Sequence, residues 1–319
     1  MSRPTIPYLN VKDTRTRFAV CVVLTLALYL LLLPLIRQAA VLAVDAGHGN
    51  TSAEASTVVS PIDRQVNHGE TAWNRDFSAM PDGPLTHRDW NFENGNLVAS
   101  YNNEAQTYTS RLSNVRVENG NLVIEAKPEN LNGRHYTSAR IDTKGSFDFT
   151  YGTLEVDMML PAGNGTWPAA WLLPARNIYK PADFGIANND HFAWSLNGEI
   201  DFVEAIGRIP GQNIPAAHSY NEIHAAPTYT PVQVSDPYGS YHRYGIIKTP
   251  TSITFTLDGV TYASRQKTSD SPLDWPYNQP YYLVINLALG GNWAGADGID
   301  DATAPWLLKI RSVAYTPNY

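Results

Sequence analysis

Short runs of alternating apolar and polar residues, separated by turn residues, fill the chain from Trp73 onward. In "YGTLEVDMML", Leu, Val and Met alternate with Glu155 and Asp157, the period of a strand with one buried and one polar face. In "TSITFTLDGVTYASR", two alternating segments flank Asp258-Gly259, a pair that favours a tight hairpin turn. The runs "NLVIEAK", "GEIDFVEAIG" and "PYYLVINLALGG" are equally short. The pattern therefore predicts many strands.

The succession of these runs indicates the class of fold. No convincing long amphipathic helix and no repeat period interrupt them, so residues 71–319 are predicted to form an all-β sandwich or barrel. A chain of 319 residues with 43% hydrophobic residues can bury a sizeable core. Residues 38–70 include "GHGNTSAEASTVVSP", which is small, polar and aperiodic, and they predict a flexible linker in front of the domain.

An apolar run precedes the linker. The stretch "FAVCVVLTLALYLLLLPLI", residues 18–36, follows a basic N-terminus, residues 1–17, and is closed by Arg37. It predicts a membrane-targeting segment over residues 18–37, with a signal anchor favoured over a cleaved signal because of its length. The basic flank predicts a cytoplasmic N-terminus and an extracytoplasmic domain, secreted or anchored to the membrane. Small residues near Ala43 and Ala46 leave cleavage of a signal peptide there as the alternative.

Composition narrows the possible functions. The single cysteine, Cys21, lies in the apolar run, so the sequence predicts neither a disulfide framework nor a cysteine metal site. The net charge of -7, without long runs of like charge, gives no electrostatic support for nucleic-acid binding. The 8 Trp and 18 Tyr residues suit a binding surface as well as a core.

Three carboxylates lie close together in "NGEIDFVEAIG". On a flat strand Glu199 and Asp201 would share one face, and Glu204 would point from the other. A β-bulge around Phe202 and Val203 would reset the pleat and return Glu204 to the face of Glu199. Like charges on one face oppose folding, which favours a functional reason for their placement, although a solvated acidic face is the alternative.

Two carboxylic acids on opposite sides of a glycosidic bond suffice for its hydrolysis. With the bulge, residues 199 and 204 would be separated like residues four steps apart on a regular strand, roughly 13 Å between Cα atoms. Side chains that lean toward each other can bring their carboxyl groups toward the roughly 5 to 5.5 Å separation of a retaining enzyme. The charge of Glu199 would raise the pKa of Glu204 and keep a proton there, while Asp201 could orient the nucleophile.

The sequence resembles glycoside hydrolase family 16, whose signature E-[ILV]-D-x-x-E on a bulged strand is matched at every position by "GEIDFVE". The resemblance continues, in the family's order, through "NNEAQTYTS", "YTSARIDTKGSFDFTYGTLEVDMMLPAGNGTWPAAWLLPA", "YHRYGI", "LDG" and "PYYLVINLALGGNWAG". It implies a concanavalin A-like β-jelly-roll sandwich with a concave glycan-binding cleft and a retaining double displacement. In that mechanism Glu199 is the nucleophile, Asp201 its partner and Glu204 the acid/base.

Within the family, "GTWPAAWLLP" and the spacing from Trp194 to Glu199 are similar to those of bacterial-type laminarinases, which implies an endo-β-1,3-glucanase. Other readings stay open at this point. The same fold can cleave mixed-linkage glucan, agarose or carrageenan, or act as a transglycosylase, because loops set that choice. A non-catalytic glycan-binding module and a membrane-anchored structural sandwich are further alternatives.

The resemblance also implies contacts with sugar for six residues: Asn103, Arg140, Trp167, Trp171, Trp194 and His224. Aromatic faces can cover the apolar faces of glucose rings, and Arg and Asn supply several hydrogen-bond donors. The alternatives are core packing for Trp167 and Trp171, a rim position without sugar contact for Trp194, a surface Arg, a turn Asn and a structural His. His224, in "NEIHAAP", resembles a strand histidine that faces the cleft, whereas Asn286 is expected to serve its strand.

Two departures from the family pattern concern packing and metal binding. Many members read H-x-Y-x-x-E-W where this chain has "HRYGIIK", with Ile247 and Lys248 at the last two positions. Members often carry V-D-Y-V-R-V-Y near the C-terminus, with an Asp that helps a structural calcium site, where this chain has Ile310. Loss of a carboxylate weakens such a site, so calcium is doubtful. We expect no catalytic metal, no required cofactor, a polysaccharide partner and a monomer.

Overall fold

The computed structural model describes residues 66–225 and 230–318. The basic N-terminus, the apolar run over 18–37 and most of the predicted linker lie outside these residues. Within the described ranges, no helix has both the length and the apolar character needed to cross a membrane.

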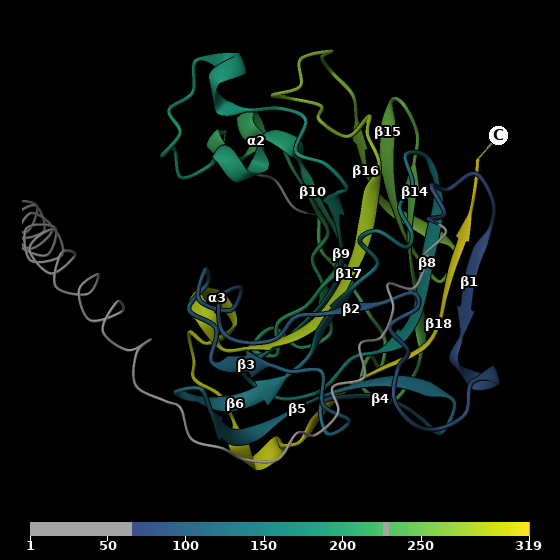
Figure 1. Cartoon of the computed structure of the whole chain (residues 1–319), viewed down its shortest axis with the longest axis vertical. Helices are drawn as coiled ribbons and strands as arrows, with labels where there is room; N and C mark the ends of the chain where they lie inside the picture. The colour runs from purple at the N-terminus through teal and green to yellow at the C-terminus, as the bar shows by residue number, and fades with distance from the viewer. Residues whose placement is uncertain (1–65, 226–229, 319) are drawn as a thin grey trace, which may run out of the picture. The chain divides into compact units, whose positions relative to one another are not determined.

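Two antiparallel sheets carry the fold (Figure 1). The six-stranded sheet runs in the order β12 (Ala216–His218), β10 (Glu199–Glu204), β9 (Thr166–Pro174), β17 (Tyr281–Leu289), β7 (Arg140–Asp142) and β2 (Asn91–Phe92). The larger sheet runs in the order β16 (Val260–Gln266), β15 (Ser252–Leu257), β14 (His242–Lys248), β8 (Gly152–Met159), β18 (Trp306–Thr316), β5 (Asn121–Leu131), β6 (Arg134–Ser138) and β3 (Gln106–Tyr108). Strand β1 (Trp73–Asp76) pairs with β18, β4 (Val115–Glu118) pairs with β5, and β3 pairs in parallel with β6.

The remaining elements are short. A separate ribbon joins β11 (Gln212–Asn213) to β13 (Val232–Gln233). The α-helical turns are α2 (Tyr220–His224) and α3 (Gly291–Ala294). The 3-10 turns are η1 (Phe77–Ala79), η2 (Pro181–Phe184), η3 (Ala193–Asn197) and η4 (Asp301–Thr303). In Figure 1 the six-stranded sheet is curved, and α2 and α3 stand at opposite ends of its concave side.

The two local predictions made from alternation are confirmed. Along β8, buried and partly exposed residues alternate at every position. The hairpin between β15 and β16 turns on Asp258 and Gly259, whose φ angles are 52° and 79°, and a two-residue turn needs positive φ at both positions. His242 Nδ1 lies 2.8 Å from Asp258 Oδ2 and supports this turn.

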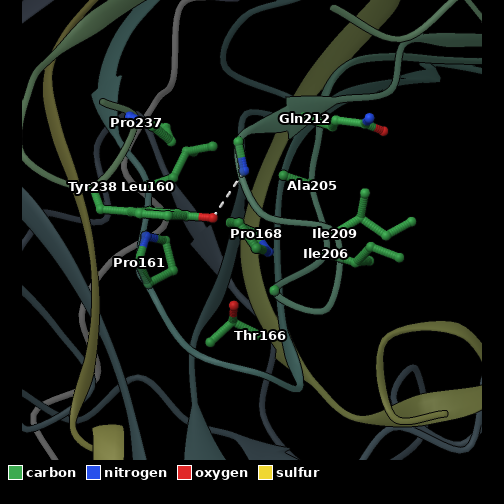
Figure 2. Close-up of a pocket in the computed structure, with 12 residues that line it drawn as sticks. Leu160, Pro161, Thr166, Pro168, Ala205, Ile206, Ile209, Gln212, Pro237 and Tyr238 are labelled. Carbon is green, nitrogen blue, oxygen red and sulfur yellow. Dashed lines mark hydrogen bonds between the residues drawn. The ribbon is translucent and has the colours of Figure 1, made fainter. Parts of the chain in front are cut away.

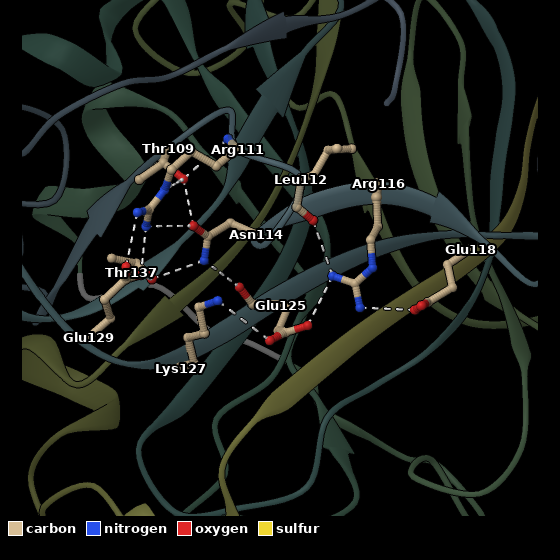
Figure 3. Close-up of polar contacts among 10 residues, drawn as sticks. All are labelled: Thr109, Arg111, Leu112, Asn114, Arg116, Glu118, Glu125, Lys127, Glu129 and Thr137. Carbon is tan, nitrogen blue, oxygen red and sulfur yellow. Dashed lines mark hydrogen bonds and ion pairs between the residues drawn. The ribbon is translucent and has the colours of Figure 1, made fainter. Parts of the chain in front are cut away.

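The core lies between the sheets and takes one face of each strand. On β10, Ile200 is fully buried, and on the larger sheet Leu154 and Val156 are fully buried as well. On the face of β5 away from the core, charged side chains form a network in which Arg116 contacts Glu125 at 2.9 Å (Figure 3). The six-stranded sheet likewise turns one face to the core, and its opposite face is left for polar side chains.

Two departures from the family pattern are accommodated inside the core. Strand β14 keeps an unbroken register with β8, although Lys248 at its end is fully buried. The Lys248 Nζ donates hydrogen bonds to the carbonyl oxygens of Thr150 and Gln279. Ile310 is also fully buried. The apolar Ile310 side chain offers no oxygen ligand at the position where the resemblance implies a calcium-site carboxylate.

The domain makes contacts before residue 71, where it was predicted to begin. The backbone of Asn67 bonds to Ser146 at 3.0 Å, and the Gly69 carbonyl accepts a bond of 2.9 Å from the Tyr315 hydroxyl. The exact end of the linker stays a prediction.

Candidate active site

Strand β10 carries a bulge. Asp201 lies opposite Trp171 of β9, and Glu204 lies opposite Ala169, but the register shifts by one residue between them. Trp171 and Ala169 are two positions apart on a regular strand and share one face, so Asp201 and Glu204 share that face too. Phe202 is the extra residue and is buried in the core. The predicted bulge is confirmed.

Glu199 belongs to the same face. It lies opposite His218 of β12, while the neighbouring pair, Ile200 and Ala217, points into the core. Glu199 is partly exposed, whereas Asp201 is only 4% exposed. The three carboxylates therefore line one surface, and β12 adds a histidine that sequence reasoning did not single out. The short run of small residues before His218 offered little signal for this strand.

His218 is the charged centre of the cluster. Its Nε2 lies 3.2 Å from Asp201 Oδ2, and its Nδ1 lies 3.7 Å from Glu222 Oε2. Burial by itself would lower the pKa of His218, but the contacts with Asp201 and Glu222 outweigh burial and raise this pKa to about 11. His218 is therefore an imidazolium at neutral pH, with both ring nitrogens acting as donors.

The same cluster has the spacing of a metal site. Ligand-type atoms of Glu199, Asp201 and His218 lie within 4.8 Å of one another. A metal ligand must be a neutral imidazole, however, and the raised pKa of His218 keeps its proton in place. The donor set is thus better suited to an ion-pair network than to a bound cation.

Both glutamates hold protons more tightly than usual. Burial, followed by repulsion from Asp201, raises the pKa of Glu199 to about 8 and raises that of Glu204 well above its usual range. The charge of His218 opposes both shifts. The charge of Arg140 also opposes the shift of Glu199 and favours its ionised form, which a nucleophile needs.

Tryptophan side chains flank the carboxylates. Trp167 Nε1 donates a hydrogen bond of 3.1 Å to Glu204 Oε1, and the Trp293 ring packs edge-on against Trp167 at 5.4 Å. On the other side, Trp194 is 49% exposed, and its ring lies 5.7 Å from that of His218. Trp194 is therefore an exposed side chain beside His218, and Trp167 is tied directly to a carboxylate.

Trp171 connects the carboxylates to the next strands. Its Nε1 donates to Asn286 Oδ1 at 2.7 Å, and the guanidinium of Arg140 lies 4.7 Å from its ring centroid. Asn286 pairs with both Ala169 and Arg140, so all of these side chains share the face of Glu204. Besides the role expected for it in its strand, Asn286 holds Trp171 in place through its amide oxygen.

Two predicted sugar contacts lie on short segments rather than on the sheet. Asn103 has a φ of 54° and donates a bond of 2.9 Å to Asn292 of α3. His224 lies on α2, where its ring packs against Phe192 at 4.7 Å. The strand position expected for His224 is wrong, because β12 ends at His218 and the chain turns into a helix after Ser219.

A buried polar group near Asn103 escaped the sequence analysis. Glu104 is 7% exposed and accepts hydrogen bonds from Gln106 at 2.7 Å and from the Tyr108 hydroxyl at 3.1 Å. A Cβ on Gly291 would lie 3.3 Å from the Trp167 ring and 3.4 Å from Glu104 Cγ, so this group reaches the wall of the site. The alternation of Glu, Gln and Tyr in "NNEAQTYTS" was the available signal.

A small cavity lies beyond the end of β10 (Figure 2). It has a volume of about 10 Å³ and is lined by side chains such as Leu160, Pro168 and Ile206. The Tyr238 hydroxyl accepts a hydrogen bond of 3.0 Å from the Gly211 amide at its edge. At most one water molecule fits, so the cavity is too small to bind a sugar.

Comparison with known proteins agrees with this architecture. The sequence profile "Glycosyl hydrolases family 16" matches residues 102–307. The beta-glucanase of Rhodothermus marinus is 35% identical over 256 residues, which cover 77% of this chain and 84% of that protein. The crystal structure of the laminarinase from Rhodothermus marinus superposes with a TM-score of 0.70 at 34% identity, covering 77% of this chain and 97% of that one.

A second solved structure, SCLam, is described as a non-specific endo-β-1,3(4)-glucanase from family GH16. It superposes with a TM-score of 0.68 at 30% identity, covering 77% of this chain and 90% of that one. The predicted all-β sandwich is therefore confirmed. The chain belongs to glycosyl hydrolases family 16.

Proposed function

We propose that this protein is a retaining endo-β-1,3-glucanase that acts by double displacement. The observation that carries the proposal is the bulge of β10, which brings Glu199, Asp201 and Glu204 to one face of the sheet. The names of the beta-glucanase and the laminarinase described above support β-1,3-glucan as the substrate.

In the first step, Glu204 gives its proton to the glycosidic oxygen as the carboxylate of Glu199 attacks the anomeric carbon. The carbon–oxygen bond to the leaving sugar breaks, and a glycosyl ester of Glu199 forms. The raised pKa of Glu204 keeps the proton available, and the Trp167 indole fixes the position of its carboxyl group. Loss of the negative charge on Glu199 in the ester then lets Glu204 ionise more readily.

In the second step, Glu204 takes a proton from water, and the resulting nucleophile attacks the same carbon from the face opposite Glu199. The ester bond breaks, and the configuration at the carbon is retained overall. Asp201 is paired with the imidazolium of His218 and lies beside Glu199, which it orients.

Aromatic and polar side chains on the same face are proposed to bind the glucan. Trp194 and Trp171 offer ring faces or edges to glucose, and Arg140 and Asn103 offer donors to hydroxyl groups. His224 is exposed on α2, and a contact between His224 and sugar stays a prediction.

The decisive experiment compares laminarin, barley mixed-linkage glucan and agarose as substrates, with Glu199→Ala as the control. We expect release of reducing sugar from laminarin, with retention at the anomeric carbon, and no release by Glu199→Ala. Laminarin hydrolysis that survives Glu199→Ala would contradict the mechanism. If glucan in a gel slows migration of the protein but no reducing sugar is released, a binding module would be favoured instead.

Mixed β-1,3/1,4 cleavage is the second candidate, favoured by the similarity to the non-specific SCLam. Equal rates on laminarin and barley glucan would support it. Products longer than the donor would indicate transglycosylation.

We further propose that the domain acts outside the cytoplasm as a monomer, exported through residues 18–37. This rests on the apolar run and its basic flank. Mass spectrometry of the N-terminus and membrane fractionation separate an anchor from a signal cleaved near Ala43 or Ala46, and light scattering measures the oligomeric state.

A further inference from the structure

Four side chains of alternating charge form a chain that leads away from the carboxylates of β10. Asp201 lies 3.2 Å from His218, His218 lies 3.7 Å from Glu222, and Glu222 lies 3.8 Å from Arg265. The side chains of Asp201, His218 and Glu222 are 6%, 15% and 14% exposed, and that of Arg265 is 27% exposed. Charges this far from water interact strongly, because little solvent screens them.

The outer end of this chain is anchored. Arg265 Nη1 donates to the carbonyl of Ala217 at 2.8 Å, and Nη2 donates to Ser219 Oγ at 3.1 Å. These two residues flank His218 at the end of β12. Arg265 itself comes from β16 of the larger sheet and lies 5.8 Å from the Tyr277 ring. It therefore fixes both the backbone beside His218 and the carboxylate of Glu222.

We propose that Glu222 is a positioning residue for the catalytic strand, acting on Asp201 through His218 and held by Arg265. The inference rests on the proposed function, since it assigns Asp201 and Glu199 their catalytic duties. Glu222 lies four residues beyond His218, on α2, and its carboxylate contacts Nδ1 of the imidazole ring, whereas Asp201 contacts Nε2. It holds the ring between two carboxylates, so that Nε2 points at Asp201.

The charged neighbours of His218 determine what loss of Glu222 does. Carboxylates on β10 face it, the Glu222 carboxylate on α2 faces it, and the Arg265 cation on β16 lies behind Glu222. Glu222→Gln removes one of the two carboxylates that keep the imidazole protonated, so His218 loses its proton at a lower pH. Above that pH, Asp201 loses its cationic partner, and the support of Glu199 is lost with it.

The test uses the full chain and reads the protonation of His218 directly by nuclear magnetic resonance of the imidazole nitrogens, assigned with His218→Gln. In the unmodified protein we expect the ring to stay protonated through pH 9. In Glu222→Gln we expect its apparent pKa to fall by at least about one unit, a tenfold change in the proton equilibrium. A control, Asp270→Asn, removes an exposed carboxylate that pairs with Lys267 and is expected to change nothing.

Kinetics on laminarin supply the second readout. The basic limb of the pH profile of kcat should move to lower pH in Glu222→Gln, and Glu222→Asp, which keeps the charge, should restore most of it. In a His218→Gln background, Glu222→Gln should have little further effect, because its influence passes through the imidazole.

Three results would overturn the inference: an unchanged titration of His218 in Glu222→Gln, an effect that persists undiminished without His218, or a Glu222→Asp protein as impaired as Glu222→Gln. If Glu222→Gln does not fold, the titration in Glu222→Asp decides, since a ring that titrates as in the free amino acid despite the retained charge contradicts the proposal. The resonance readout needs no activity. Absence of laminarin hydrolysis in the unmodified protein would refute the proposed function and leave this measurement standing.

Discussion

Phe202 shows how one residue sets the chemistry of the site. It enters the core as the extra residue of the bulge, and so it moves Glu204 to the outer face beside Asp201. Burial of its large aromatic side chain stabilises the bulge. This stabilisation outweighs the loss of regular strand pairing at Phe202. Residues with no chemistry of their own therefore determine where the carboxylates lie.

The proton donor can be tested by a single substitution. Glu204→Gln keeps the shape of the side chain but removes the transferable proton. We expect kcat/KM on laminarin to fall by roughly 10² to 10⁴. An aryl glucoside with a good leaving group needs less acid catalysis and should lose much less activity. Equal losses on both substrates would contradict the assignment.

Trp167 gives a pH-dependent prediction. Its indole hydrogen bond favours the ionised form of Glu204 and so lowers the pKa of that group. Trp167→Phe removes the donor, the pKa of Glu204 rises further, and its proton is retained to higher pH. The basic limb of kcat/KM should therefore move to higher pH. A shift of this limb to lower pH would count against the assigned role of Glu204.

Lys248 makes stability depend on pH. Burial lowers the pKa of this group well below its usual range, so between the folded and unfolded pKa values the unfolded chain binds the extra proton. Stability should thus rise with pH through that window. Relative to Lys248→Met, the free energy of unfolding should rise by at most about 1.4 kcal/mol per pH unit. Denaturant titrations at several pH values measure this, and parallel curves for the two proteins would refute it.

At the scale of elements, the turn from β17 into α3 brings the backbone close to the site. Gly291 has a φ of 75°, and its Cα faces Trp167 and Glu104 without a side chain between them. A Cβ there would also lie 2.9 Å from the carbonyl oxygen of Asn102. The turn therefore tolerates glycine alone.

Gly291→Ala should cost stability and activity together. The positive φ costs of order 1–3 kcal/mol with any side chain, and the new methyl group pushes on Trp167. Gly298→Ala is a matched control, because Gly298 has a φ of 84° but open space around it. Both variants should lower the melting temperature, and only Gly291→Ala should lower kcat/KM substantially. Equal activities would show that the crowding does not matter.

The strands of the site were more predictable than its helices. Alternation identified β8 and the β15–β16 hairpin, and crowded carboxylates indicated the bulge of β10, because each signal is local. The contacts of His218 were not predictable, since they join β10, β12 and α2 across segments with no shared pattern. His224 was assigned to a strand by its resemblance to a family histidine, although its segment forms a single helical turn.

At the scale of the whole molecule, the described fold can be tested for dependence on calcium. Ile310 lies fully buried at the position where the resemblance implies a calcium-site carboxylate, and the single cysteine of the sequence is Cys21. We therefore expect EDTA to leave the melting temperature unchanged. A clear decrease, reversed by calcium, would locate oxygen ligands elsewhere in the fold.

The register of the six-stranded sheet determines the length of glucan chain that the site can contact. Glu204, Ala169, Asn286 and Arg140 form one row across four strands, so the backbone of Arg140 lies three strand spacings, about 14 Å, from the backbone of Glu204. More than one sugar ring is needed to cover a row of this length. Short oligosaccharides therefore make fewer contacts and bind more weakly than long chains. Digestion should slow down when small oligosaccharides remain, and it should not proceed to free glucose.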